Sequence, residues 1–329
     1  MTEIAPQLIV EPDDGLEPVR AFISSAQSSL LIKQFTFTEP SLVEAAIDRF
    51  KAGVNVRVML NAKRSGGDRA NDETYERFMH EGIDVQWSNP AFYVTHEKSI
   101  VVDDTAAMVA TYNLMIKYFT LTRDYGIITH DPRHIQQIID VFNADWGHRE
   151  FTPLEDHGLL WSNSNSRYQM ARFIDRATRT LHVQHPKFVD AVILDRLVGA
   201  AERGVKVKVL CGGRHGISEW DILDTFSSLR TLRRFGVKVH KQKNLRVHAK
   251  LIVLDECEAL VGSMNIDRSA FDLRRERGLP TTDPAVVGRL LHVFDSDWES
   301  SHHYEPPDPL DTAAHHEDDF PHDDDLIHE

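Results

Sequence analysis

The hydrophobic positions of the chain follow two periods that alternate along the sequence. Residues 29–37 (SLLIKQFTF) and 54–61 (VNVRVMLN) carry the short apolar runs typical of strands. Residues 40–53 (PSLVEAAIDRFKAG) instead have the three-to-four-residue spacing of an amphipathic helix. The strand-like QLIV at 7–10 is likewise followed by a helix-spaced stretch. This alternation predicts an α/β fold, with mixed sheets flanked by helices.

The same order of elements returns in the second half of the chain. GVNVRVML returns as GVKVKVLC, and HEKSIVVDD returns as HAKLIVLDE, whose histidines His96 and His248 are 152 residues apart. That offset also relates Asn113 to Asn265, RDYG to RERG and FNADW to FDSDW. One register at so many points indicates an internal duplication. We therefore predict two tandem units related by a pseudo-twofold axis, over residues 1–152 and 153–301.

Composition narrows the class of protein. The net charge is −14, but ten acidic residues and no Lys or Arg lie in 302–329. This segment also holds six histidines, so we predict a disordered acidic tail, with metal binding by its histidines as the less favoured alternative. No apolar run reaches the roughly 18 residues that span a bilayer, and no secretory signal opens the chain. Cys211 and Cys257 are too few for a disulfide framework. These absences favour a cytoplasmic protein.

Each copy places a histidine and a lysine two residues apart at the start of an apolar strand. His96 and Lys98 precede the SIVV run, and His248 and Lys250 precede LIVL. Side chains two apart in a strand point to the same face, so each copy presents an imidazole beside an ammonium group. Two units that meet face to face would bring both pairs into one pocket. A monomer would then hold a complete site.

This set of side chains suits cleavage of a phosphodiester. One imidazole can attack phosphorus while the other protonates the leaving oxygen. The lysines can stabilise charge on the phosphoryl oxygens, so we expect neither a metal nor a cofactor. A single His-x-Lys-x4-Asp is weak evidence, because it arises often by chance. The prediction depends on two copies in register, each followed by Ser/Thr-x-Asn.

The duplicated pattern resembles the signature of the phospholipase D superfamily, and the resemblance covers essentially residues 5–300. The matching residues are His96, Lys98 and Asp103 in the first copy and His248, Lys250 and Asp255 in the second. GSMN at 262–265 matches the small-residue turn that follows, whereas the first copy has ATYN at 110–113. The missing glycine predicts that the two halves contact substrate unequally.

The resemblance implies a covalent phosphohistidine intermediate that water or an alcohol resolves. Family precedent makes His96 the nucleophile, while His248 protonates the leaving group and later activates the acceptor. The residues expected to hold the phosphoryl oxygens are Lys98, Lys250, Asn113 and Asn265, with Thr111 and Ser263 among the phosphate-binding residues. Asp103 and Asp255 are expected to be structural, because they lie beyond the apolar strand from the His–Lys end.

A histidine used in this way needs a carboxylate on its other ring nitrogen, which fixes the tautomer and raises basicity. Asp124 and Glu276 are the candidates, because they occupy equivalent positions 28 residues after the histidine of their own copy. Family members similarly use an acid at about this distance. The alternative is that RDYG and RERG are surface turns with ion pairs.

The substrate class stays open among phosphodiesters. Residues 262–279 resemble bacterial cardiolipin-synthase-like proteins, which favours hydrolysis or transfer of a phospholipid, with peripheral membrane contact. The alternatives are a metal-independent nuclease and a non-catalytic phosphate-binding protein. Residues 230–250 hold eight Lys/Arg and no acid, which suits lipid headgroups, a nucleic-acid backbone or solvated basic faces. The sequence does not decide between these substrates, between water and an alcohol as acceptor, or among oligomeric states.

Overall fold

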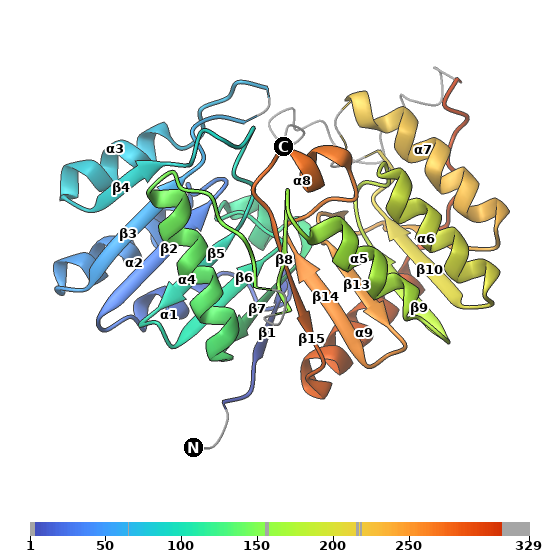
Figure 1. Ribbon diagram of the computed structural model, residues 1–329, viewed down its shortest axis with the longest axis horizontal. Coiled ribbons are helices and arrows are strands. Elements are labelled where there is room, and N and C mark those ends of the chain that lie inside the picture. The colour runs from blue at the N-terminus through green and yellow to red at the C-terminus, as the bar shows by residue number, and fades with distance from the viewer. Residues whose placement is uncertain (1–3, 65, 155–157, 215–216, 218, 311–329) are drawn as a thin grey trace.

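The computed structural model describes residues 4–64, 66–154, 158–214, 217 and 219–310 (Figure 1). The first half contains β1 (Gln7–Glu11), α1 (Glu17–Ser24), β2 (Ser29–Gln34), α2 (Pro40–Lys51), β3 (Asn55–Leu60), α3 (Asp72–Glu81), β4 (Asp84–Trp87), β5 (Ser99–Val102), β6 (Ala106–Ala110), the 3₁₀ helix η1 (Ile116–Phe119), β7 (Thr122–Thr129) and α4 (Pro132–Trp146). The second half contains β8 (Leu160–Trp161), α5 (Ser166–Asp175), β9 (Thr180–Gln184), α6 (Ala191–Glu202), β10 (Lys206–Cys211), α7 (Glu219–Arg234), β11 (Lys238–Lys241), β12 (Arg246–Val247), β13 (Leu251–Leu254), β14 (Glu258–Gly262), α8 (Arg268–Asp272), β15 (Arg277–Thr281), α9 (Pro284–Ser300) and β16 (His302–His303).

The two halves build the same sheet. The strand order is β1-β7-β6-β5-β2-β3-β4 in the first and β8-β15-β14-β13-β9-β10-β11-β16 in the second. In both, the three strands linked by helical crossovers are parallel and the hairpin strands are antiparallel. Figure 1 shows the two units beside each other, the first in blue to green and the second in yellow-green to red. The predicted duplication and the mixed sheets are confirmed.

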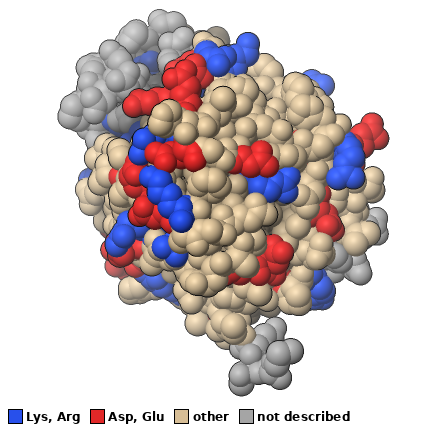
Figure 2. Space-filling view, turned by 90° about the vertical axis from the view of Figure 1, so that its left-hand side faces the viewer, with Lys and Arg blue, Asp and Glu red and all other residues tan. Residues whose placement is uncertain are grey.

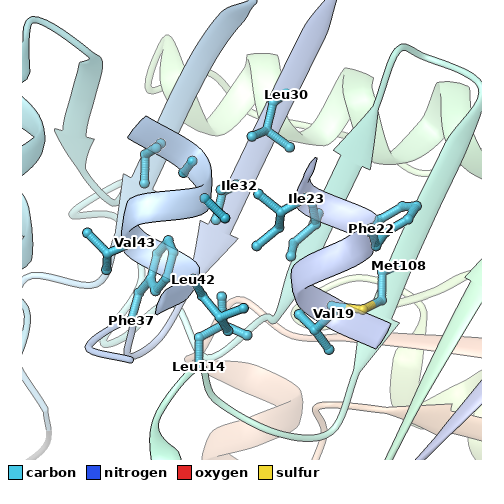
Figure 3. Close-up of a cluster of buried hydrophobic side chains, with 14 of the residues drawn as sticks. Val19, Phe22, Ile23, Leu30, Ile32, Phe37, Leu42, Val43, Met108 and Leu114 are labelled. Carbon is cyan, nitrogen blue, oxygen red and sulfur yellow. The ribbon is translucent and has the colours of Figure 1, made fainter. Parts of the chain in front are cut away.

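Each sheet has an outer face covered by its own helices. In the first unit, Leu30 and Ile32 of β2 lie in one buried cluster with Ile23 of α1 and Leu42 of α2 (Figure 3). Leu31, between them in the strand, belongs to a different cluster. This period of two places alternate strand residues on opposite faces of the sheet, as the sequence pattern predicts.

The inner faces of the two sheets share one core. Val101 of β5 and Val253 of β13 lie in the same cluster, together with Val141 of α4 and Leu290 of α9. Burying each such side chain stabilises the fold by about 1.5–3 kcal/mol. The interface between the units is therefore continuous apolar core. Residues at the ends of these strands are therefore held in fixed positions.

Short segments exchange between the units. Strand β12 comes from the second half of the sequence but pairs in parallel with β7 of the first, Arg246 with Thr122 and Val247 with Arg123. An isolated bridge between Thr95 and Arg275 makes the reciprocal contact. The boundary near residue 152 therefore remains a prediction from the sequence repeat, while in space the units are interlocked.

The acidic segment is ordered at its start. His302 and His303 form β16, which pairs antiparallel with β11, and the N–H of Tyr304 donates to the carbonyl of Val239. Disorder is therefore the wrong prediction for these first residues, because the edge of β11 offers unpaired backbone groups and Tyr304 packs on the second unit's outer core. Residues 311–329, with most of the predicted tail, lie outside the described residues.

The outer surface of the first unit carries both signs of charge. Figure 2 shows Lys and Arg interspersed with Asp and Glu on this face. Several of them pair, such as Lys51 with Glu81 at 3.0 Å and Arg77 with Glu44 at 3.2 Å. Exposed pairs of this kind contribute little to stability. The face carries mixed charge of the sort found on solvated surfaces.

Candidate active site

The two His–Lys pairs stand at the start of β5 and β13, and each is anchored to the other unit. The N–H groups of His96 and Glu97 donate to the carbonyl of Arg275 at 2.9 and 3.0 Å. The N–H groups of His248 and Ala249 donate in the same way to the carbonyl of Arg123 at 3.3 and 2.9 Å. The apolar run after each pair is buried, with Val101 in the first copy and Leu251 and Val253 in the second lying in the shared core. Both motifs therefore lie at the junction of the units.

Each histidine is held by a carboxylate from the opposite unit. His96 Nδ1 lies 2.9 and 3.0 Å from the two carboxyl oxygens of Glu276, and His248 Nδ1 lies 2.7 Å from Oδ1 of Asp124. All four side chains are buried. The sequence singled out both carboxylates correctly as partners of buried imidazoles. The 28-residue spacing suggested pairing within a copy, however, and the pairs instead cross the interface.

The surroundings of Glu276 favour its ionised form. Burial raises the pKa of this carboxyl, but the nearby His96, with further help from Lys98, outweighs burial and holds the pKa below its ordinary value. An ionised carboxylate accepts a hydrogen bond from the Nδ1–H of the neutral ring. That tautomer leaves Nε2 of His96 with its lone pair. The pair is thus arranged for a ring nitrogen to act as nucleophile or base.

The two lysines are buried next to their histidines but are not placed identically. Lys250 Nζ lies 2.8 Å from Nε2 of His248, whereas Lys98 Nζ donates to the backbone carbonyl of His96 at 2.7 Å. Aromatic rings support both imidazoles: Phe35 contacts His96 at 4.8 Å and Tyr118 contacts His248 at 4.7 Å between ring centroids. These lysine contacts differ between the two halves, and the unequal contact with substrate stays a prediction.

The two hydroxyls among the predicted phosphate-binding residues have partners within the chain. Thr111 donates to Asp124 Oδ1 at 2.5 Å and accepts from the N–H of Tyr125. Ser263 accepts from the N–H of Arg277 at 3.1 Å. Both hydroxyls thus contact the strands that carry the carboxylates, and their contact with phosphate stays a prediction. Asn113 and Asn265 are buried in the turns after β6 and β14, and their predicted contact with phosphate stands as a prediction.

The motif aspartates hold turns at the other end of the strands. Asp103 accepts the backbone N–H groups of residues 27, 28 and 29, just before β2. Asp255 accepts those of residues 178, 179 and 180, just before β9. Such contacts lower the pKa of Asp255 to about 2, even though burial raises it. These bonds have the pattern expected of structural residues.

The sequence did not single out a second set of crossed contacts, which clamp the carboxylate-bearing strands. Arg123 pairs with Asp297 of α9 at 2.8 Å, and Arg275 pairs with Asp145 of α4 at 2.8 Å. Each arginine directly precedes the carboxylate that reaches across to a histidine. The repeated RDYG/RERG and FNADW/FDSDW segments were the signal, since both partners recur in register.

A further imidazole lies by the site. His185, which follows β9, is buried, and burial with the nearby Lys250 lowers the pKa of its ring to about 3. It is therefore neutral at physiological pH. Because the ring is neutral, it does not repel the ammonium group of Lys250. No sequence pattern distinguishes it from the other histidines among the 18 in the chain.

Replacing Asp297 by Asn should destabilise the protein by about 3 kcal/mol, because it leaves a buried guanidinium with a weaker partner. The measurement is the free energy of unfolding from urea denaturation. Asp295→Asn on the same helix is the matched control, since Asp295 is 53% exposed and pairs with Lys208 at 3.3 Å. It should cost less than about 1 kcal/mol. Equal losses in the two variants would contradict a structural clamp at Asp297.

The described part of the chain contains no helix long and apolar enough to cross a membrane. Both histidine–carboxylate pairs lie at the junction of the two units. Comparison with known proteins identifies this arrangement.

Solved structures share the fold. Phosphatidylserine synthase from Haemophilus influenzae superposes with a TM-score of 0.75 at 12% identity, covering 92% of this chain and 89% of that one. Polyphosphate kinase from Porphyromonas gingivalis gives 0.74 at 16% identity, covering 92% of this chain and 48% of the kinase. At such identities the likeness concerns the fold alone.

Curated relatives are cardiolipin synthases. The major cardiolipin synthase of Bacillus subtilis is 24% identical over 332 residues, which cover 88% of this chain and 68% of the relative. Cardiolipin synthase A of Pseudomonas putida is 24% identical over 345 residues, covering 93% and 71%. The chain thus spans about two thirds of the length of these relatives.

Residues 19–146 and 170–298 match the family described as "Cardiolipin synthase, PLD-like domain". The two matched stretches coincide with the two repeated units, so the predicted resemblance is confirmed. The prediction of a phospholipase D-type enzyme is confirmed at the level of the family. The chain therefore belongs to the phospholipase D superfamily, as a member of its cardiolipin synthase-like PLD domain family.

Proposed function

We propose that this protein cleaves a phospholipid phosphodiester through a covalent phosphohistidine, without a metal ion. The observation that carries the proposal is the pair of crossed imidazole–carboxylate contacts, His96 with Glu276 and His248 with Asp124, each with a lysine alongside. Two histidines with fixed tautomers are what a double-displacement at phosphorus requires.

In the first step Nε2 of His96 attacks phosphorus and the bond to the leaving oxygen breaks. His248, carrying a proton on Nε2, gives that proton to the leaving oxygen. In the second step neutral His248 takes a proton from water or an alcohol, whose oxygen attacks phosphorus and breaks the P–N bond. His96 is then regenerated. Lys98 and Lys250, with the amides of Asn113 and Asn265, are proposed to hold the non-bridging oxygens.

The family and its curated relatives favour a lipid substrate over nucleic acid. The basic segment 230–250 is weaker evidence for a nucleic-acid substrate than its eight Lys/Arg suggest. Arg233 donates to Glu305 at 2.9 Å, and Arg230 donates to Asp308 at 3.3 Å. Part of its charge is therefore neutralised within the chain. We retain nuclease activity as the second candidate, because a phosphohistidine mechanism serves either diester.

The decisive experiment offers four substrates in the presence of EDTA: phosphatidylglycerol, phosphatidylcholine, single-stranded DNA and duplex DNA. We expect cleavage of phospholipid with a trapped phosphohistidine. Adding glycerol or excess phosphatidylglycerol as acceptor separates hydrolysis from transfer. Cleavage of DNA alone would replace the lipid proposal by the nuclease. If no diester is cleaved and no phosphohistidine forms, the protein is a phosphate-binding member of the family.

One chain carries both crossed histidine–carboxylate pairs, which supports our proposal that a monomer is active. We also propose that the protein works in the cytoplasm, in peripheral contact with a membrane that supplies its substrate. Co-sedimentation with vesicles containing phosphatidylglycerol tests that contact.

A further inference from the structure

We propose that two exposed leucines beside the active site, Leu121 and Leu273, together with the basic residues around them, form the surface through which this protein docks on an anionic phospholipid membrane. The inference rests on the lipid substrate proposed above and names the residues that bring the site to it. Four observations support it: the place of the leucines in the repeat, their exposure, their distance from the site and the charge of the segments that carry them.

The two leucines occupy equivalent positions in the duplicated chain. The offset of 152 residues relates Leu121 to Leu273. Each lies just after a short helix, η1 in the first unit and α8 in the second. The N–H of each donates to the carbonyl four residues earlier, that of Lys117 or Ser269, at 2.9 Å. The same backbone turn therefore presents a leucine in both units.

The fold uses the backbone of these leucines and leaves their side chains partly in solvent. The carbonyl of Leu121 accepts the N–H of Arg246 at 3.0 Å, and that of Leu273 accepts the N–H of Tyr93 at 2.9 Å. Any residue other than proline can make such backbone bonds. Leu121 is 45% exposed and Leu273 is 55% exposed. One exposed leucine needs no explanation, but leucine exposed at both equivalent positions indicates a use for an apolar side chain there.

Both leucines lie close to the crossed histidine–carboxylate pairs. Leu121 is three residues before Asp124, and Leu273 is three residues before Glu276. Three residues span at most about 11 Å between Cα atoms, so each leucine is within that distance of a carboxylate of the site. Figure 1 shows α8, which ends just before Leu273, in the upper middle of the molecule, where the two units meet. The leucines therefore flank the junction that holds the site.

Each leucine has a second exposed apolar residue beside it. Ile116, in the helix before Leu121, is 59% exposed. Tyr93, whose N–H binds the carbonyl of Leu273, is 60% exposed. Tyrosine is enriched at membrane–water interfaces, because its ring is apolar and its hydroxyl is polar. Both sides of the junction thus present an apolar pair to the exterior.

The segments that carry these residues are basic, although the chain as a whole has a net charge of −14. Residues 116–121, 243–247 and 268–273 hold four Lys/Arg and one acid, Asp272. The four, all exposed or half-exposed, are Lys117, Lys243, Arg246 and Arg268. Asp272 accepts two bonds at 2.7 Å from Arg167, so its charge is compensated within the chain. A basic surface on an acidic protein is complementary to anionic lipid headgroups.

The kind of apolar residue favours a membrane over a nucleic acid as the partner. Proteins that bind single strands stack the bases on aromatic rings, and three of these four apolar residues are aliphatic. Apolar side chains with Lys and Arg beside them are instead typical of surfaces that lie in the membrane interface. The surface therefore fits a lipid bilayer that contains anionic headgroups.

The test is co-sedimentation of the full-length protein with phosphatidylcholine vesicles that contain phosphatidylglycerol. We expect the double variant Leu121→Ser/Leu273→Ser to bind at least about tenfold more weakly than wild type, because it removes two inserted side chains. Wild-type binding should also fall with pure phosphatidylcholine vesicles and at high salt, which screens the basic residues.

The chain offers a matched control in Leu154→Ser/Phe235→Ser. Leu154 and Phe235 are 55% and 45% exposed, the same values as Leu273 and Leu121. Phe235 precedes β11 at the start of the parallel strands, whereas His248 lies beyond their carboxyl ends. The control should bind vesicles as wild type does. Equal losses in the two double variants, or unchanged binding in the leucine variant, would overturn the proposal.

Two other partners are separate outcomes of the same experiment. Binding of single-stranded DNA in place of vesicles would assign the surface to a nucleic acid. A wild-type dimer that dissociates in the leucine variant, seen by sedimentation velocity, would assign it to a second copy of the chain. Either result contradicts membrane docking.

Vesicle binding needs no turnover, so the surface is tested even if the substrate panel finds no cleavage. In an active protein, the leucine variant should keep the wild-type kcat on short-chain phosphatidylglycerol dissolved as monomers. On vesicles its rate should fall by about tenfold, in line with the weaker binding. An equal fall on monomers and vesicles would show that the leucines serve the site or the fold rather than the membrane.

Discussion

A His248→Asn variant given a phosphodiester with a p-nitrophenol leaving group should release about one equivalent of nitrophenol and then stop. This leaving group departs without a proton, so His96 can still form its bond to phosphorus. The second step fails, because no base activates the acceptor. With an alkoxide leaving group the same variant should lose at least about 10³-fold in rate, the usual range for a lost general acid. Acid-quenched protein should carry the phosphoryl group on His96.

The reciprocal variant separates the two roles. His96→Asn lacks the nucleophile, so we expect no burst and a loss of about 10⁵-fold or more with every substrate. His292→Asn, which changes an exposed histidine of α9, is the control and should retain full turnover. A burst from His96→Asn and none from His248→Asn would reverse the assignment. The role order taken from family precedent would then be wrong.

The architecture could be predicted from the sequence because hydrophobic periodicity is a local pattern, and the same pattern occurs in both halves of the chain. A period of two along 29–34 and of three to four along 40–51 depends only on which face of each element is buried. The duplication then supplied the symmetry, and the strand orders of the two sheets agree with it. The His–Lys pairs followed from the same reasoning, since both residues precede a buried strand.

Periodicity does not specify which unit a side chain meets across the interface. The spacing of 28 residues made Asp124 look like the partner of His96, but the carboxylates are exchanged, and Asp124 binds His248. The exchange arises because β12 joins the first sheet and Thr95 bridges to the second, which no local pattern records.

The same limit applies to the two hydroxyls. The resemblance to the phospholipase D superfamily implied that the Ser/Thr-x-Asn after each motif contacts phosphate. In the folded chain Thr111 and Ser263 end strands whose neighbours are β7 and β15, so their hydroxyls are used within the sheets. Sequence spacing placed them at the site but did not give the direction of the side chains.

The crossed pairing leads to the second prediction of large effect: Asp124→Asn and Glu276→Gln should each lower turnover by about 10³-fold while the protein stays folded. An amide that donates to Nδ1 forces the proton of a neutral ring onto Nε2. That ring can then neither attack phosphorus nor accept a proton through Nε2. Asp140→Asn, on the exposed face of α4, is the control and should have no effect. Unchanged turnover in both carboxylate variants would remove their assigned role.

Nitrogen chemical shifts then test whether the units exchange carboxylates in solution. Asp124→Asn should change the tautomer of His248, the imidazole it contacts at 2.7 Å, and leave that of His96 unaltered. Glu276→Gln should do the reverse, because its oxygens lie about 3 Å from His96. A change at the histidine of the same copy would contradict the crossed arrangement. If the crossed result is found, neither unit has a complete imidazole–carboxylate pair of its own, so catalysis requires both units to be docked through their shared core.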